Sequence, residues 1–182
     1  MAGSDSEFAE YFGARAAGLR RLAYTLCGDW HTADDLVQST FIKLYRHWHR
    51  IRGQSVDAYA RRILVNSYLS HRRDRRREEV VPEVPELSAA GLDPLVGSDD
   101  RLARALRELP ARQRAVVALR HLEDMSVAEV ADALGMAEGT VKSQAFRGVA
   151  ALRRALGEPA QASPNDLAAL EQTRPTKGRA PS

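Results

Sequence analysis

The sequence has little of what several classes of protein require. Cys27 is the only cysteine among 182 residues, so the chain can form no internal disulfide and offers no cluster of thiolates for zinc. No apolar run approaches the length of a membrane span, and the first ten residues hold three acidic side chains in place of a basic leader. Patterns typical of β-strands are almost absent. We therefore expect an all-α, cytoplasmic protein without a metal site or a cofactor.

The common signatures of catalysis are missing as well. The glycines form no phosphate-binding loop, there is no H-E-x-x-H motif, and no serine or cysteine has the surroundings of a known nucleophile. His47 and His49 are two residues apart and would diverge on a helix, while Cys27 and His31 lie on either side of a predicted helix end. We expect a binding protein and not an enzyme.

Charge is divided unevenly along the chain, although the net charge is only +3. Residues 1–77 hold 14 Lys and Arg against 8 Asp and Glu, and residues 101–157 hold 10 against 6. Between them, residues 78–100 hold seven acidic residues and no basic ones. Two basic blocks joined by an acidic segment indicate two surfaces that face a polyanion. The plainer alternative is the solvated helix faces of an arginine-rich protein.

Apolar residues recur with helical spacing through most of the chain. They predict helices over residues 8–26, from a cap at Thr32 to Trp48, from about Asp57 past Leu69, and over residues 100–109 and 111–122. The third helix ends in five arginines within residues 72–77. So dense a cluster suits phosphates, whereas a charged and frayed helix end is the alternative interpretation.

Periodicity fails between residues 78 and 100, where prolines and glycines predict a flexible linker. Beyond residue 157 the chain is rich in proline and in small and polar residues, which favours disorder. The chain thus divides into a helical domain of residues 1–77, an acidic linker of residues 78–100, a second helical domain of residues 101–157 and a disordered tail of residues 158–182.

Residues 126–147 predict a helix-turn-helix. Ser126 and Glu129 form a capping box that starts the first helix, and Gly135 suits its end. The second helix begins at about Gly139, with Val141 on its buried face. Its polar face suits the major groove of DNA, although an ordinary solvated face is the alternative. The side chains predicted to contact DNA there are Lys142, Ser143, Gln144, Phe146 and Arg147.

Four stretches in this order resemble the bacterial RNA polymerase sigma factors of the extracytoplasmic-function class. They are ADDLVQSTF at residues 33–41, ARRILVN at 60–66, LPARQR at 109–114 and GTVKSQ at 139–144. The last, with Arg147 and Gly148, is most similar to the actinobacterial sigma-E-like subgroup. The resemblance implies a region 2 helical domain at residues 1–77, which binds core polymerase and the −10 element. It implies a region 4 domain at residues 101–157, which binds the −35 element.

The resemblance also implies partners and site residues. The partners are promoter DNA, the coiled coil of the largest polymerase subunit, the flap region of the polymerase and an anti-sigma factor. The residues implied for core polymerase are Asp35, Leu36, Val37, Gln38 and Phe41. Those implied for the −10 element are Arg52, Gly53, Gln54, Ser55, Tyr59, Arg62, Asn66, Arg72 and Arg73. The chain departs from the family pattern at Ser70, where many relatives have an acid, and at Ala137, where a serine cap is common.

Two other functions fit parts of the same sequence. A stand-alone regulator with a C-terminal helix-turn-helix requires an upstream receiver or ligand-binding domain, whereas residues 1–77 are helical and basic. A helical adaptor of a DNA-bound complex has no need of the arginines in residues 72–77. We therefore expect a sigma factor that directs core polymerase to promoters.

Overall fold

The computed structural model describes residues 2–51, 55–78 and 100–157, and within these ranges it contains helices and no strands. None of the described helices is both long and apolar enough to cross a membrane. The all-α prediction is confirmed, while the predicted linker and tail lie almost entirely outside the described residues. The elements are α1 (Ala2–Cys27), α2 (Trp30–His47), the 3₁₀ turn η1 (Trp48–Arg50), α3 (Val56–Glu78), α4 (Asp100–Glu108), α5 (Ala111–Val117), the π-helical turn η2 (Ala118–Leu122), α6 (Val127–Leu134) and α7 (Glu138–Ala155).

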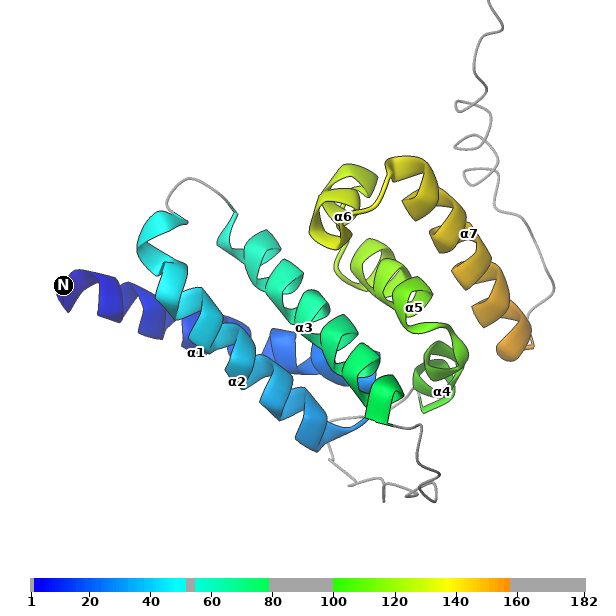
Figure 1. Ribbon diagram of the computed structural model, residues 1–182, viewed down its shortest axis with the longest axis horizontal. Helices are drawn as coiled ribbons and strands as arrows, with labels where there is room; N and C mark the ends of the chain where they lie inside the picture. The colour runs from blue at the N-terminus through cyan, green and yellow to red at the C-terminus, as the bar shows by residue number, and fades with distance from the viewer. Residues whose placement is uncertain (1, 52–54, 79–99, 158–182) are drawn as a thin grey trace, which may run out of the picture.

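The first three helices form one bundle, which lies beside the bundle of α4 to α7 (Figure 1). Its apolar interior includes Leu22, Leu44 and Leu64, and aromatic rings extend it toward the N-terminus. There the ring of Phe8 packs edge-on against Trp48, with centroids 5.1 Å apart. Such contacts between a ring near the start of α1 and a ring directly after the end of α2 fix the two helices against each other.

The start of α2 differs from the prediction. Asp29, and not Thr32, is the N-cap, because its carboxylate accepts a hydrogen bond from the backbone N–H of Thr32 at 2.7 Å. Hydrogen bonds from the side chain and from the backbone N–H of Thr32 lower the pKa of Asp29 below its usual value. The prediction was wrong here because both residues are good caps, and the one farther upstream adds a turn to the helix.

The helix-turn-helix forms as predicted. Ser126 and Glu129 make both bonds of the capping box, and Gly135 ends α6 with a left-handed φ of 60°. The hydrogen bonds to Ser126 lower the pKa of Glu129. α7 begins at Glu138 with no side-chain cap from Ala137. Because Glu138 lies in the first turn, its charge favours the helix dipole there.

The two bundles share one apolar core, which the sequence did not predict. Buried Leu26 and Val65 from the first bundle belong to the same cluster as Val116, Leu119 and Val130 from the second. Between residues 100 and 157, α4, α5 and η2 approach α1, while α5 and α6 approach α3. The two predicted helical domains are therefore present as two bundles that pack against each other.

Arg114 holds the two bundles together at one end of this contact. Only 6% of the residue is exposed, and its guanidinium donates to the backbone carbonyl of Leu26 at the end of α1. It also donates to the carbonyls of Arg107 at 2.5 Å and Leu109 at 3.1 Å, at the end of α4. Helix C-termini attract cations, and burial lowers the pKa of Arg114. One side chain thus caps two helices from different bundles.

Candidate nucleic-acid interface

The polar face of α7 is the first candidate surface. Phe146 and Arg147 are exposed on it, Lys142, Ser143 and Gln144 are half-buried, and Val141 on the opposite side is fully buried. Arg147 lies along the helix, since its Nε donates to the backbone carbonyl of Ser143 at 3.2 Å. Gln144 accepts a hydrogen bond from Gln113 of α5 at 3.4 Å. All five residues predicted for the −35 element therefore lie on one helix, with Arg147 at its exposed side.

A second candidate surface is a polar hollow of about 450 Å³ between α2 and α3. Three of the residues predicted for the −10 element, Tyr59, Arg62 and Asn66, line it together. Lys43 reaches the same hollow from α2 and donates to the hydroxyl of Ser67 at 2.9 Å. An aromatic ring, an amide and two cations around one hollow are the groups that bind single-stranded nucleic acid.

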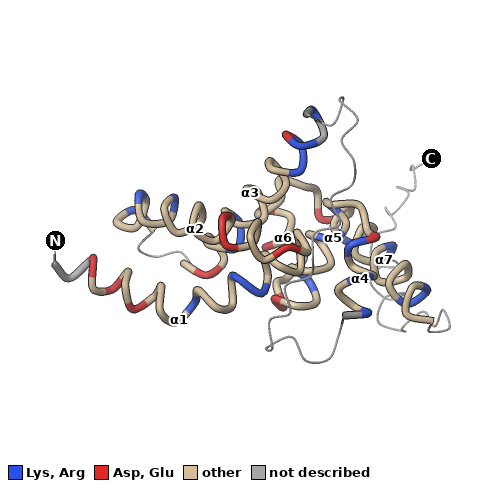
Figure 2. Tube along the Cα trace, turned by 90° about the horizontal axis from the view of Figure 1, so that it is seen from below, with Lys and Arg blue, Asp and Glu red and all other residues tan. Residues whose placement is uncertain are grey.

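The other residues predicted for the −10 element are Arg52, Gly53, Gln54, Ser55, Arg72 and Arg73. Arg52, Gly53 and Gln54 are outside the described residues. Arg72 and Arg73 are exposed near the C-terminal end of α3, where Figure 2 shows basic residues on a helix end that projects from the bundle. The exposed position of these guanidinium groups agrees with a role as phosphate contacts.

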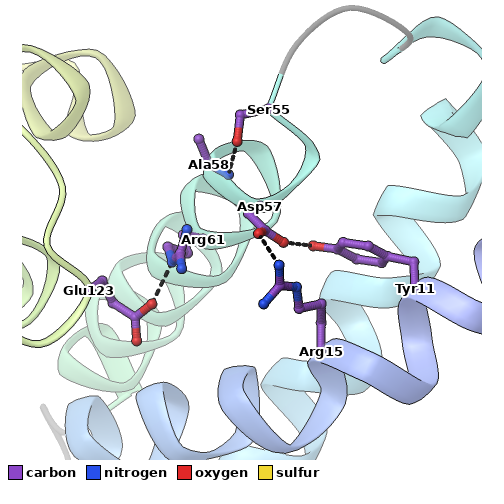
Figure 3. A network of polar contacts seen from close by, with 7 residues as sticks. All are labelled: Tyr11, Arg15, Ser55, Asp57, Ala58, Arg61 and Glu123. Carbon is purple, nitrogen blue, oxygen red and sulfur yellow. Dashed lines mark hydrogen bonds and ion pairs between the residues drawn. The ribbon is translucent and has the colours of Figure 1, made fainter.

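The start of α3 is fixed by a polar network that Figure 3 shows. Ser55 accepts a hydrogen bond from the backbone N–H of Ala58 at 3.4 Å. Asp57 accepts one from the hydroxyl of Tyr11 at 2.9 Å and pairs with Arg15 at 2.7 Å. Burial, together with the bond to Asp57, raises the pKa of Tyr11, which keeps its hydroxyl protonated as a donor. The network ties α3 to α1 directly after residues 52–54.

Lys43 and Arg61 are not among the site residues predicted from the sequence. In the sequence, Lys43 is an ordinary polar position beside the apolar stripe of α2. No neighbouring residue indicates that its side chain faces α3. Arg61 lies beside the predicted Arg62, but its Nε pairs at 2.5 Å with Glu123 from the segment between η2 and α6. Only the packing of one element on another reveals such partners.

A third surface is an apolar groove of about 610 Å³ on α1 and α2. The groove is open although it is lined by large hydrophobic side chains, and Phe12, Ile42 and Tyr45 are each close to half exposed. Its lining also includes Phe8, Asp34, Val37, Gln38, Phe41 and Arg46. An exposed apolar groove of this kind is a candidate protein-binding site.

Of the five residues predicted for core polymerase, three line this groove. Val37 and Gln38 line it, and Phe41 forms part of its floor, being almost fully buried beneath it. Asp35 is exposed on the same helix. Leu36 is buried among the core residues and does not line the groove, because it lies on the inward side of α2.

Comparisons with known proteins cover both bundles. Residues 12–78 match the family model of Sigma-70 region 2, and residues 99–152 match that of Sigma-70, region 4. The RNA polymerase sigma-E factor of Streptomyces avermitilis is 40% identical over 152 residues, which span 82% of this chain and 85% of that protein. The chain belongs to the sigma-70 family. It is a sigma factor of the extracytoplasmic-function class, and it directs RNA polymerase to promoters and promotes initiation.

Further relatives agree with this assignment. The extracytoplasmic-function sigma factor SigL of Mycobacterium tuberculosis is 37% identical over 155 residues, covering 79% of this chain and 85% of that one. The sigma factor RpoE of Bartonella quintana, in its co-crystal structure with the anti-sigma factor NepR, matches with a TM-score of 0.73 at 30% identity. That match covers 83% of this chain and 97% of the other, so it extends over both bundles. The regulator and adaptor alternatives are not favoured, because residues 12–78 match a sigma region.

Proposed function

We propose that each of the three surfaces of this sigma factor binds a different ligand. The polar face of α7 reads the −35 duplex, the hollow between α2 and α3 holds the melted −10 strand, and the groove on α1 and α2 docks on the largest subunit of core polymerase. The observation that carries the proposal is that each surface has the chemistry its ligand needs and is lined by its own residues. We infer a cytoplasmic location from that task, and no catalytic role.

At the −35 element, we assign base contact to Arg147 and phosphate contact to Lys142. Arg147 is exposed, and its guanidinium can leave the backbone of Ser143 for a guanine edge, which offers two acceptors. Lys142 is half-buried, so its apolar stem packs on the helix while its ammonium group reaches a phosphate.

Arg147→Ala should therefore cost about 1–3 kcal/mol at a matched −35 element and relax the preference at one base pair. Lys142→Ala should weaken binding about equally on all sequences. It should also reduce the slope of log affinity against log salt concentration by about one unit. The measurement is transcription by the reconstituted holoenzyme from a panel of −35 substitutions. An even loss across the panel for Arg147→Ala, with a shifted base preference for Lys142→Ala, would reverse the two assignments.

At the −10 element, we assign the hollow of Lys43, Tyr59, Arg62 and Asn66 to the single strand. The ring of Tyr59 offers a stacking surface, and Asn66 offers a donor and an acceptor to a base edge. Lys43 lies across the hollow from α3 and suits the backbone phosphates. Arg72 and Arg73, farther along α3, would continue the basic track that the phosphates follow.

An anti-sigma factor is the further partner that we propose. Support comes from the sigma factor RpoE, which shares this fold across both bundles and was crystallised with one. The test is to purify the tagged chain from its native host and to add each co-purifying protein to reconstituted transcription. We expect one of them to lower transcript yield in proportion to its concentration. If none does, the chain has no such partner under the growth conditions used.

A further inference from the structure

Helix α5 packs behind α7 at close range. On α5, Gln113 and Val117 lie one turn apart and share a face of the helix, and on α7 the same holds for Gln144 and Gly148. Gly148 is buried where the two faces meet. A Cβ atom added to it would overlap Cγ2 of Val117 and lie 3.2 Å from Cγ of Gln113. Because the β-branched side chain of Val117 is stiff and almost fully buried, only glycine permits this approach.

The side chain of Gln113 is presented by a helix that is held in one orientation. Arg114, the next residue along α5, is buried and donates to the backbone carbonyls of Leu26, Arg107 and Leu109. Consecutive side chains on an α-helix are about 100° apart, so the anchored Arg114 sets the direction in which Gln113 points, which is toward α7. The packing of the protein itself therefore fixes the position of Gln113.

Gln113 engages one of the two polar atoms of the Gln144 side chain. Its Nε2 donates to Oε1 of Gln144 at 3.4 Å, and both side chains are half-buried. The amide of a glutamine has an oxygen that accepts and an NH2 group that donates, at separate corners of one plane. With the oxygen turned toward α5, the NH2 group is the part of Gln144 that is left for a ligand on the outer side of α7.

We propose that Gln113 is a positioning residue for −35 recognition: it holds the amide of Gln144 so that Gln144 acts as a hydrogen-bond donor to the base. The inference rests on the proposed function of α7. In the major groove, guanine presents the acceptors O6 and N7, and thymine presents the acceptor O4. Adenine and cytosine present amino groups, which are donors themselves. Gln144 should thus select guanine or thymine, although a glutamine with both polar atoms available pairs best with adenine.

The test is transcription by the reconstituted holoenzyme from a promoter library randomised through the −35 segment, with the transcripts sequenced. Gln144→Ala locates the base that Gln144 contacts, because preference should be lost at that position alone. There we expect wild type to favour guanine or thymine over adenine by about tenfold, and Gln113→Ala to reduce this preference to about twofold, because the released amide can rotate.

Gln113→Glu is the decisive variant, because a merely structural role of Gln113 predicts no reversal of preference. A carboxylate only accepts hydrogen bonds, so it should bind the NH2 group of Gln144 and turn the amide oxygen outward. The preferred base at that position should then become adenine or cytosine. Arg112→Gln is the matched control: it lowers the charge by the same single unit at the exposed neighbouring position and should leave every base preference as in wild type.

A wild-type preference for adenine or cytosine at the Gln144 position would overturn the proposal, as would wild-type preferences in both Gln113 variants. A uniform loss of preference across the segment in both Gln113 variants would assign Gln113 a merely structural role and refute it too. Arg147→Ala on the same library separates these failures from a failure of the proposed function. If Arg147→Ala relaxes one position and Gln144→Ala relaxes none, α7 still reads the −35 element but Gln144 does not. If neither variant changes a preference, both proposals fail.

Discussion

Ile42→Asp should abolish transcription by the reconstituted holoenzyme while the isolated protein keeps its fold. Ile42 lines the apolar groove with 48% of its surface exposed, so the substitution should change the free energy of unfolding by less than about 0.5 kcal/mol. Within an interface with core polymerase, however, a carboxylate would be buried against apolar groups. We expect the affinity for core polymerase to fall by at least about 30-fold, as at a central interface residue.

The control for this prediction is Leu122→Asp. Leu122 is an equally exposed large hydrophobic residue, at 47%, but it lies on η2 and not in the groove. It should leave co-purification with core polymerase and transcript yield near wild type. Equal losses for the two variants, or wild-type co-purification by Ile42→Asp, would show that the groove is not the polymerase surface.

The largest effect on stability should come from Arg114→Met. Methionine fills a similar volume but leaves the carbonyls of Leu26, Arg107 and Leu109 without their charged donor. Hydrogen bonds from charged groups contribute about 1.5–3 kcal/mol each, and part of this is offset because the guanidinium no longer has to be desolvated. We expect a loss of about 2–4 kcal/mol, measured by urea denaturation.

Arg112→Met is the matched control, since Arg112 is exposed on the same helix. It should change stability by less than about 0.5 kcal/mol. Arg114→Lys should recover only part of the loss, because an ammonium group cannot span carbonyls at the ends of two helices as the planar guanidinium does. A cost below about 0.5 kcal/mol for Arg114→Met would mean that Arg114 does not hold the bundles together.

The features best predicted from the sequence are those that depend on a few neighbouring residues. The capping box of Ser126 and Glu129 and the left-handed Gly135 are settled within a few residues of chain, and both formed as expected. Helical periodicity likewise identified the all-α fold and the polar face of α7. The choice of Asp29 over Thr32 as a cap shows the limit of local reasoning, because two good candidates compete within one turn.

What the sequence could not predict is where one element meets another. Arg114 belongs to a recognisable motif, yet its burial against the end of α1 depends on how the bundles pack. Lys43 and Arg61 acquire their roles from neighbours that are 24 and 62 residues away in the chain. The pairing of Arg62 with Asp132 is of the same kind, since each charge taken alone looks like an exposed helix position.

The most direct measurement is transcription by the holoenzyme from a promoter library randomised upstream of the start site, with the transcripts sequenced. Wild type, Arg147→Ala and Asn66→Ala should each be tested on the same library. Our expectation is that Arg147→Ala relaxes base preference in the upstream −35 segment alone, and that Asn66→Ala relaxes it in the −10 segment alone. Changes of both variants in the same segment, or uniform losses with no change in base preference, would contradict it.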